Sequence, residues 1–91
     1  MEAKEAIDIG KKYLTDLFGT DLDSPPRLEE VWRDQKNVWN VILGFYRKPN
    51  DLAGIAGLKP FSTHERKVVR VDDTSGTALS ITDPLRVMLD H

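Results

Sequence analysis

The chain has 91 residues, of which 40% are hydrophobic and 31% are charged, with a net charge of −2 and no cysteine. This composition predicts one soluble globular domain over residues 1–91, with room for one modest hydrophobic core. The acidic balance argues against nucleic acid as a partner. The lack of cysteine excludes disulfides, and no apolar run approaches the ~20 residues of a membrane span.

The first predicted element is an amphipathic helix over residues 3–18. Its apolar residues recur at spacings of three and four, which places them on one helix face. They are Ala3, Ala6, Ile7, Gly10, Tyr13, Leu14, Leu17 and Phe18. Gly19 is a natural C-terminal stop, because glycine adopts the left-handed conformation without steric cost. Gly10 on the apolar face predicts close approach of the helix to a sheet.

A linker and two strands follow the helix. Residues 20–27, TDLDSPPR, predict a linker because two prolines cannot continue a helix. Residues 27–34, RLEEVWRD, predict a first strand, and QKN gives a short turn before VWNVILGFYR at 38–47, the strongest strand pattern in the chain.

Alternation divides the strand over residues 38–47 into two faces. The face predicted to meet the helix carries Trp39, Val41, Leu43 and Phe45. The other face is of mixed character and carries Val38, Asn40, Ile42, Gly44 and Tyr46. We therefore expect the second face to be partly solvated.

Two more strands complete the pattern. HERKVVRVD over residues 64–72 alternates so that Val69 and Val71 share the face expected in the core. DTSG at residues 73–76 predicts a turn, in which Gly76 takes a positive φ.

TALSIT over residues 77–82 predicts the last strand, with Leu79 and Ile81 pointing inward. Asp83 followed by Pro84 is a helix-start pattern, so the sequence allows a short C-terminal helix. The order predicts an α+β fold, with one N-terminal helix packed on a four-stranded antiparallel sheet.

VVRVDDTSGTALSI resembles the closing hairpin of PepSY-like domains, and AKEAIDIGKKYLTDLFG resembles their opening helix. At fold level the resemblance extends to cystatin-like proteins, in which an antiparallel sheet wraps one helix. It implies a non-catalytic domain of a kind associated with protease inhibition or with regulation at the cell envelope. The glutamine-valine-glycine inhibitory loop of cystatins is absent, because Asn37 and Trp39 stand where valine and glycine are needed. No functional residue is therefore carried over.

The patterns that carry chemistry are incomplete. HERKV begins like a zinc-protease motif, but Val68 stands in place of the second histidine, and His64 and His91 are the two histidines of the chain. Glu29 and Glu30 are adjacent in a predicted strand, so we expect them on opposite faces and not as a carboxylate pair. The sequence predicts no catalytic residue, metal or cofactor.

GIAG at residues 54–57 matches the G-x-x-G of KH loops that clamp RNA. Such a loop needs basic character and flanking helices, whereas this one is apolar and lies between predicted strands. We therefore predict no nucleic-acid partner.

Surface recognition is the function class that remains. The sheet face away from the helix is expected to carry Val38, Ile42, Tyr46, Val68 and Ala78, with Trp32 joining from the first strand. Such a patch marks a partner or dimer interface, unless the C-terminal PLRVML segment or the loop at residues 50–62 covers it. The candidate partner surface comprises Trp32, Ile42, Tyr46, Leu52, Ile55, Leu58 and Phe61.

The loop NDLAGIAGLKPFS over residues 50–62 is too apolar for a solvated tether. Its glycines make it pliable, so we expect Leu58 and Phe61 to anchor it and the stretch from Leu52 to Ile55 to form a mobile tip.

We predict a small non-enzymatic protein-binding module, inhibitory or regulatory in role, with an unknown protein partner or a second copy. The start of the chain lacks the apolar run of a signal peptide, which predicts a cytoplasmic protein without a membrane partner. Two alternatives stay open. One is a small-molecule-binding or catalytic domain with a pocket between helix and sheet. The other is a homodimeric unit joined through the open face or an edge strand.

Overall fold

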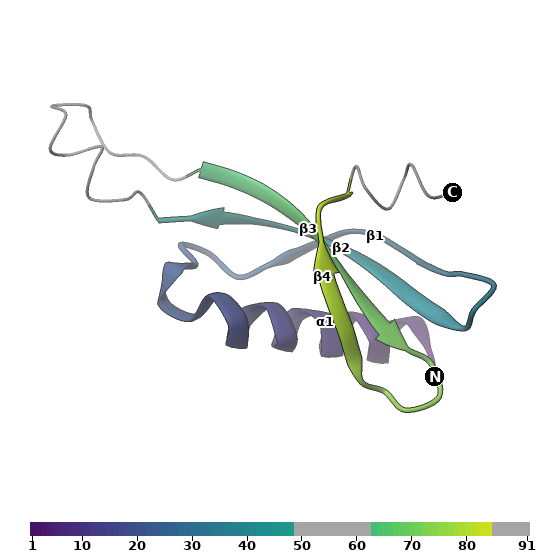
Figure 1. Cartoon of the computed structure of the whole chain (residues 1–91). Coiled ribbons are helices and arrows are strands. Elements are labelled where there is room, and N and C mark those ends of the chain that lie inside the picture. The colour runs from purple at the N-terminus through teal and green to yellow at the C-terminus, as the bar shows by residue number, and fades with distance from the viewer. Residues whose placement is uncertain (49–62, 85–91) are drawn as a thin grey trace, which may run out of the picture.

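The computed structural model describes residues 1–48 and 63–84. Its elements in chain order are α1 (Ala3–Phe18), η1 (Gly19–Asp21), β1 (Arg27–Arg33), β2 (Val38–Arg47), β3 (Thr63–Asp72) and β4 (Ala78–Thr82). The strands pair antiparallel in the order β1-β2-β3-β4, and α1 lies across one face of the sheet (Figure 1). This confirms the predicted α+β fold, with each strand within one residue of its expected bounds.

Two glycines set how closely helix α1 packs on the sheet and where it ends. Gly10 is buried, and a Cβ added to it would lie 3.4 Å from the Cβ of Val41, which confirms the predicted close approach. Gly19 ends the helix with a φ of 53°, and its N–H donates to the Thr15 carbonyl. A positive φ of this size favours glycine, so the predicted stop is also confirmed.

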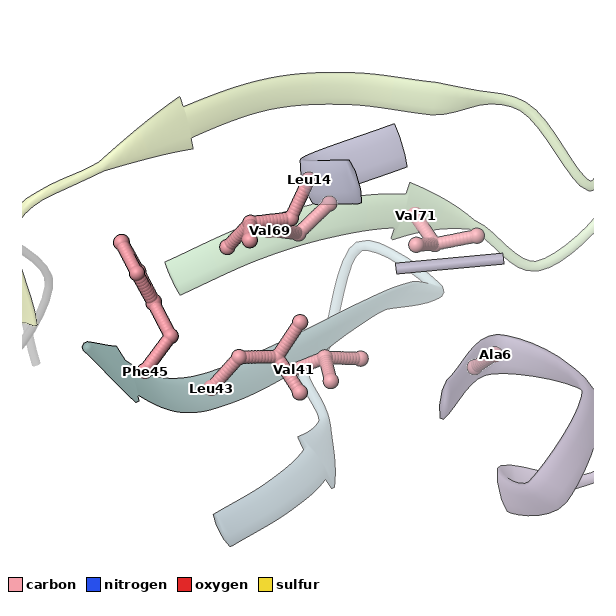
Figure 2. Close-up of a cluster of buried hydrophobic side chains, with 7 residues drawn as sticks. All are labelled: Ala6, Leu14, Val41, Leu43, Phe45, Val69 and Val71. Atoms are coloured by element: carbon pink, nitrogen blue, oxygen red, sulfur yellow. The ribbon is translucent and has the colours of Figure 1, made fainter. Parts of the chain in front are cut away.

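The core lies between α1 and the sheet, as the strand alternation predicted. Figure 2 shows its buried side chains, which come from α1, β2 and β3. They are Ala6, Leu14, Val41, Leu43, Phe45, Val69 and Val71. Phe18 packs on Phe45 with ring centroids 5.1 Å apart, and Trp39 and Ile81 pack against the cluster from its margin. These residues hold the helix and the two central strands as one unit.

The prediction for Leu79 is wrong, because β4 carries a bulge. Val71 pairs with Ala78, but the neighbouring pair involves Ser80, so Leu79 is an extra residue in β4. The extra residue shifts the alternation. Ala78 therefore packs against the core on the helix side instead of lying on the opposite face, and Leu79 is 53% exposed.

The predicted linker also forms structure, because it pairs with the end of β2. The N–H of Asp23 donates to the Tyr46 carbonyl at 2.8 Å, and the N–H of Lys48 donates to the Asp21 carbonyl at 2.9 Å. An isolated bridge joins Leu22 to Arg47. The outer edge of β2 is thus covered beyond the point where β1 begins.

Several predictions fall outside the described residues. They concern Leu52, Ile55, Leu58 and Phe61 in the predicted loop, and the short C-terminal helix beyond Pro84. Within residues 1–48 and 63–84, no helix has the length and apolar character needed to cross a membrane.

Candidate functional site

The sheet face away from α1 is not a continuous apolar surface. Val38, Ile42 and Val68 lie on it, as the alternation predicted, but their side chains are buried, and those of Ile42 and Val68 have no exposed area. Trp32 is half-buried, and Tyr46 is 47% exposed. Of the described members of the predicted partner surface, Tyr46 at the end of β2 is therefore the one that faces solvent.

A bulge in β1 places two carboxylates on this face. The β1–β2 register shifts between Leu28 and Glu30, which makes Glu29 an extra residue. Glu30 pairs with Ile42 on the face away from the helix, and Glu29 Oε2 lies 2.6 Å from the position a Cβ on Gly44 would occupy. The expectation that Glu29 and Glu30 point to opposite faces is therefore wrong.

Gly44 makes room for a polar cluster that crosses β2. Glu29 Oε2 accepts a hydrogen bond of 2.8 Å from Nε of Arg66, so an ion pair joins β1 to β3 over the glycine. His64 Nε2 lies 3.2 Å from the same Cβ position on Gly44. The ring of Tyr46 meets that of His64 edge-on, with centroids 5.0 Å apart. We call Glu29, Tyr46, His64 and Arg66 the Tyr46 cluster.

The Tyr46 cluster lies where the β2–β3 hairpin extends beyond its neighbours. Strand β1 begins opposite Gly44, and β4 ends opposite Val68, whereas β2 and β3 stay paired as far as Arg47 and Thr63 (Figure 1). Residues 45–47 and 63–67 therefore extend past β1 and β4, and we call them the hairpin end. On the β2 side, residues 21–23 pair with this end. Sequence reasoning did not assign Glu29, His64 and Arg66 to a site, although a glycine within a strand is a signal of close approach.

Ion pairs occupy the helix side of the hairpin end. Arg47 Nε lies 3.1 Å from Glu65 Oε2, and its guanidinium lies over the Phe18 ring at 5.3 Å. Lys67 Nζ lies 2.6 Å from an Asp83 carboxylate oxygen. The charges on this side are matched within the chain, as are those of Arg66 and Glu29 in the Tyr46 cluster.

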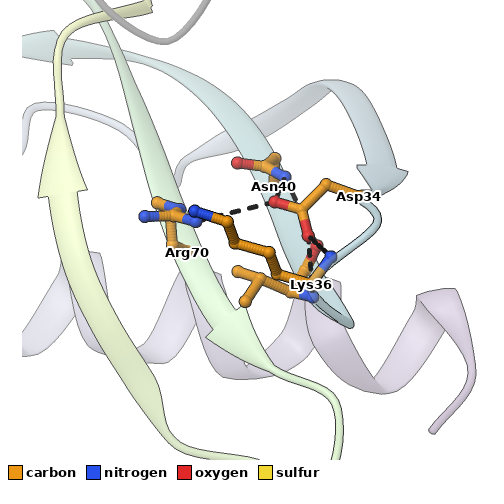
Figure 3. Close-up of polar contacts among 5 residues, drawn as sticks. Asp34, Lys36, Asn40 and Arg70 are labelled. Atoms are coloured by element: carbon orange, nitrogen blue, oxygen red, sulfur yellow. Dashed lines mark hydrogen bonds and ion pairs between the residues drawn. The ribbon is translucent and has the colours of Figure 1, made fainter. Parts of the chain in front are cut away.

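A second polar cluster lies at the opposite end of the sheet and holds the β1–β2 turn (Figure 3). Asp34 Oδ1 accepts hydrogen bonds from the backbone N–H groups of Lys36 at 2.9 Å and Val38 at 3.1 Å. Asp34 Oδ2 accepts from Asn40 Nδ2 at 3.3 Å and lies 3.5 Å from Arg70. Asn40 is buried, and its Nδ2 also donates to the Val38 carbonyl at 3.3 Å, so the cluster satisfies buried polar groups, which is a structural role.

The surroundings of three aspartates favour their ionised forms. Burial raises the pKa of Asp34, but its hydrogen bonds and the Arg70 charge outweigh burial and lower it. The backbone N–H of Ser75 lowers the pKa of Asp72. The pKa of Asp73 is lowered chiefly by the indole N–H of Trp39, which donates to its carboxylate at 2.8 Å.

These shifts predict that the fold weakens in acid. A carboxyl whose pKa is lower in the folded than in the unfolded chain stabilises the fold above its unfolded pKa of about 3.9, and this contribution disappears as the pH falls through the folded value. Urea unfolding across a pH series should therefore show a falling free energy of unfolding below about pH 4 to 5. The Asp72→Asn variant should show a shallower fall, and an equal slope in both proteins would contradict the assignment.

The described ranges contain no group of three or more histidine, aspartate and glutamate side chains placed to hold a metal ion. The Tyr46 cluster places an aromatic ring, an imidazole and an ion pair together at one end of the sheet. No protein-family model, curated protein or solved structure matches this chain.

Proposed function

We propose that this chain is a non-enzymatic protein-binding module, inhibitory or regulatory in role, and that it contacts its partner through the Tyr46 cluster. The observation that carries the proposal is the exposed Tyr46 ring, which is held edge-on by His64 beside the Arg66–Glu29 ion pair. Tyrosine and arginine are enriched among the residues that dominate binding energy at protein interfaces. The resemblance to PepSY-like and cystatin-like domains suggests the same class of role.

Contacts within the cluster support this role. The edge-on ring contact restrains Tyr46, and the 2.8 Å hydrogen bond restrains Arg66. Side chains that are already fixed lose less conformational freedom on binding, so more of the contact energy contributes to affinity. Gly44 makes this possible, because a side chain there would meet Glu29 and His64.

Two features favour this reading over the alternatives. The layer between helix and sheet is filled by buried apolar side chains, which favours a surface contact over a ligand pocket there. Strands β1 and β4 each carry a bulge, and bulges at sheet edges discourage edge-to-edge pairing with a second copy.

Site-specific photocrosslinking in the native host tests the proposal. A benzoylphenylalanine placed at Tyr46 should give one discrete heavier adduct after irradiation. The matched control is the same residue at Leu79, which has a similar exposed fraction but lies in the β4 bulge. Leu79 should give no such adduct, and Arg66→Ala should weaken the one formed at Tyr46.

The mass of the adduct distinguishes a different protein partner from a second copy of this chain. An adduct containing a different polypeptide supports the proposal, whereas one at twice the chain mass identifies a second copy and contradicts it. Equal adducts from Tyr46 and Leu79, or none from either, would also contradict a contact at the Tyr46 cluster.

A further inference from the structure

The middle of the sheet face away from α1 is buried, although no described helix or strand packs over it. We call it the outer face, and its described side chains are Trp32, Val38, Asn40, Ile42, Val68 and Thr82. Ile42 and Val68 have no exposed area. Two polar atoms, Thr82 Oγ1 and Trp32 Nε1, are also shielded from solvent. Within residues 1–48 and 63–84, α1 is the helix that covers the sheet, and it covers the opposite face (Figure 1). An outer face open to water would leave such side chains partly exposed.

The neighbouring side chains do not account for this burial. Glu30 and Arg66 flank the outer face and are exposed. Arg70 reaches toward the β1–β2 turn, where its guanidinium lies 3.5 Å from Asp34. Trp32 is half-buried with its own N–H shielded, so it needs a cover as well. Because this burial belongs to a single chain, we infer that the cover comes from the same chain, outside the described residues.

Residues 49–62 are the less suitable source of this cover. They join β2 to β3 beyond Arg47 and Thr63, at the tip of the hairpin end. Tyr46 and His64 lie on the same face between that tip and the buried part, and both are exposed. A segment that reached the buried part from the tip would pass over these two side chains and bury them.

The residues that follow Pro84 have a shorter path. Thr82 pairs with Val68, so the chain leaves β4 directly beside the buried part of the outer face. It continues as LRVMLDH over residues 85–91. Because Asp83 followed by proline is a helix-start pattern, a helical turn can begin at this point.

The sequence of residues 85–91 suits an apolar face. In a helix, spacings of three and four place Leu85, Met88 and Leu89 on one side. Val87 falls on the opposite side. A helix over residues 85–91 is about 10 Å long, and neighbouring strands lie about 4.8 Å apart. A helix that starts beside β4 can therefore reach across β3 to β2.

We propose that residues 85–91 dock on the outer face over Ile42 and Val68. The apolar side of the segment provides the contacts, which gives the sheet a second hydrophobic layer opposite α1. The docking does not depend on a partner at the Tyr46 cluster, so either proposal can fail without the other.

Methyl NMR on the full chain tests the docking directly. Met1 and Met88 are the two methionines of the chain, so selective labelling of methionine methyls gives two signals. The Met88 methyl should show nuclear Overhauser contacts with the methyls of Ile42 and Val68. The Met1 methyl is the internal control, because it lies near Ile9 and should contact that residue instead. If the Met1 contact is seen and Met88 shows none with the outer face, the proposal is overturned.

The same spectra identify any other occupant of the outer face. In a mixture of chains with different isotope labels, contacts between chains would show that a second copy covers it. Contacts to Ile42 from residues 50–62 would show that the loop covers it. Either result overturns the proposal, whereas contacts from Met88 within one chain support it.

Two neighbouring substitutions give an independent readout. Met88→Ala shortens a side chain expected on the docked side, whereas Val87→Ala shortens one expected on the solvent side. In urea unfolding, Met88→Ala should raise the equilibrium constant of unfolding by about tenfold or more. Val87→Ala should change it by no more than about twofold. Both variants keep the core between α1 and the sheet, so both should fold. Equal effects of the two substitutions would contradict the docking.

Discussion

Replacing Phe45 with alanine is expected to lower the free energy of unfolding by about 3–5 kcal/mol. Its side chain is 1% exposed in the core cluster, and its ring packs on Phe18 at 5.1 Å. The substitution removes that contact and leaves a cavity where β2 meets the end of α1. Urea denaturation followed by circular dichroism measures the loss, and the slope of the transition should stay unchanged.

The neighbouring residue gives a matched control. Tyr46 is also an aromatic residue of β2, but it points to the opposite face and is 47% exposed. Tyr46→Ala should therefore cost no more than about 1 kcal/mol, from the lost contact with His64. Equal losses in the free energy of unfolding for Phe45→Ala and Tyr46→Ala would contradict the placement of Phe45 in the core and Tyr46 on the surface. A stable Tyr46→Ala protein is also the variant with which to measure partner binding.

Replacing Asp34 with alanine is expected to cost about 2–3 kcal/mol, the second largest effect. The carboxylate holds the β1–β2 turn through two backbone N–H groups and also accepts from Asn40, which is 2% exposed. Alanine removes one acceptor of the buried amide, which keeps its hydrogen bond to the Val38 carbonyl. A buried N–H that loses its acceptor costs more than an average hydrogen bond contributes. Thermal unfolding of the variant should show a clearly lower midpoint.

Two controls define the source of this loss. Gln35→Ala changes an exposed side chain in the same turn and should stay within about 0.5 kcal/mol of the parent. Asp34→Asn keeps an oxygen for the backbone N–H groups but sets an amide against Asn40 and Arg70, so its loss should be intermediate. A parent-like Asp34→Ala protein would show that the turn is held by other contacts.

The long strands were predictable because their alternation is unbroken. Val41, Leu43 and Phe45 in β2 and Val69 and Val71 in β3 all face α1, as period two requires. The glycines were equally readable. Gly19 ends α1 with φ 53°, and Gly76 turns the last hairpin with φ 68°, both in the region where glycine has no steric penalty.

Two of the wrong predictions, those for Leu79 and Glu29, have one physical cause. Leu79 and Glu29 are each the extra residue of a bulge, and a bulge reverses the alternation on one side of itself. Its position depends on how two strands fit against each other. The bulge in β1 lies where Gly44 leaves room for the Glu29 carboxylate over β2. The local pattern of RLEEVWR therefore does not indicate its position.

The sequence by itself determined the elements, the fold class and the composition of the core, because these follow from hydrophobic periodicity and from the conformational limits of glycine and proline. Only the tertiary structure decided the site. Glu29, Tyr46 and Arg66 come from three different strands, and their contacts depend on register and bulges.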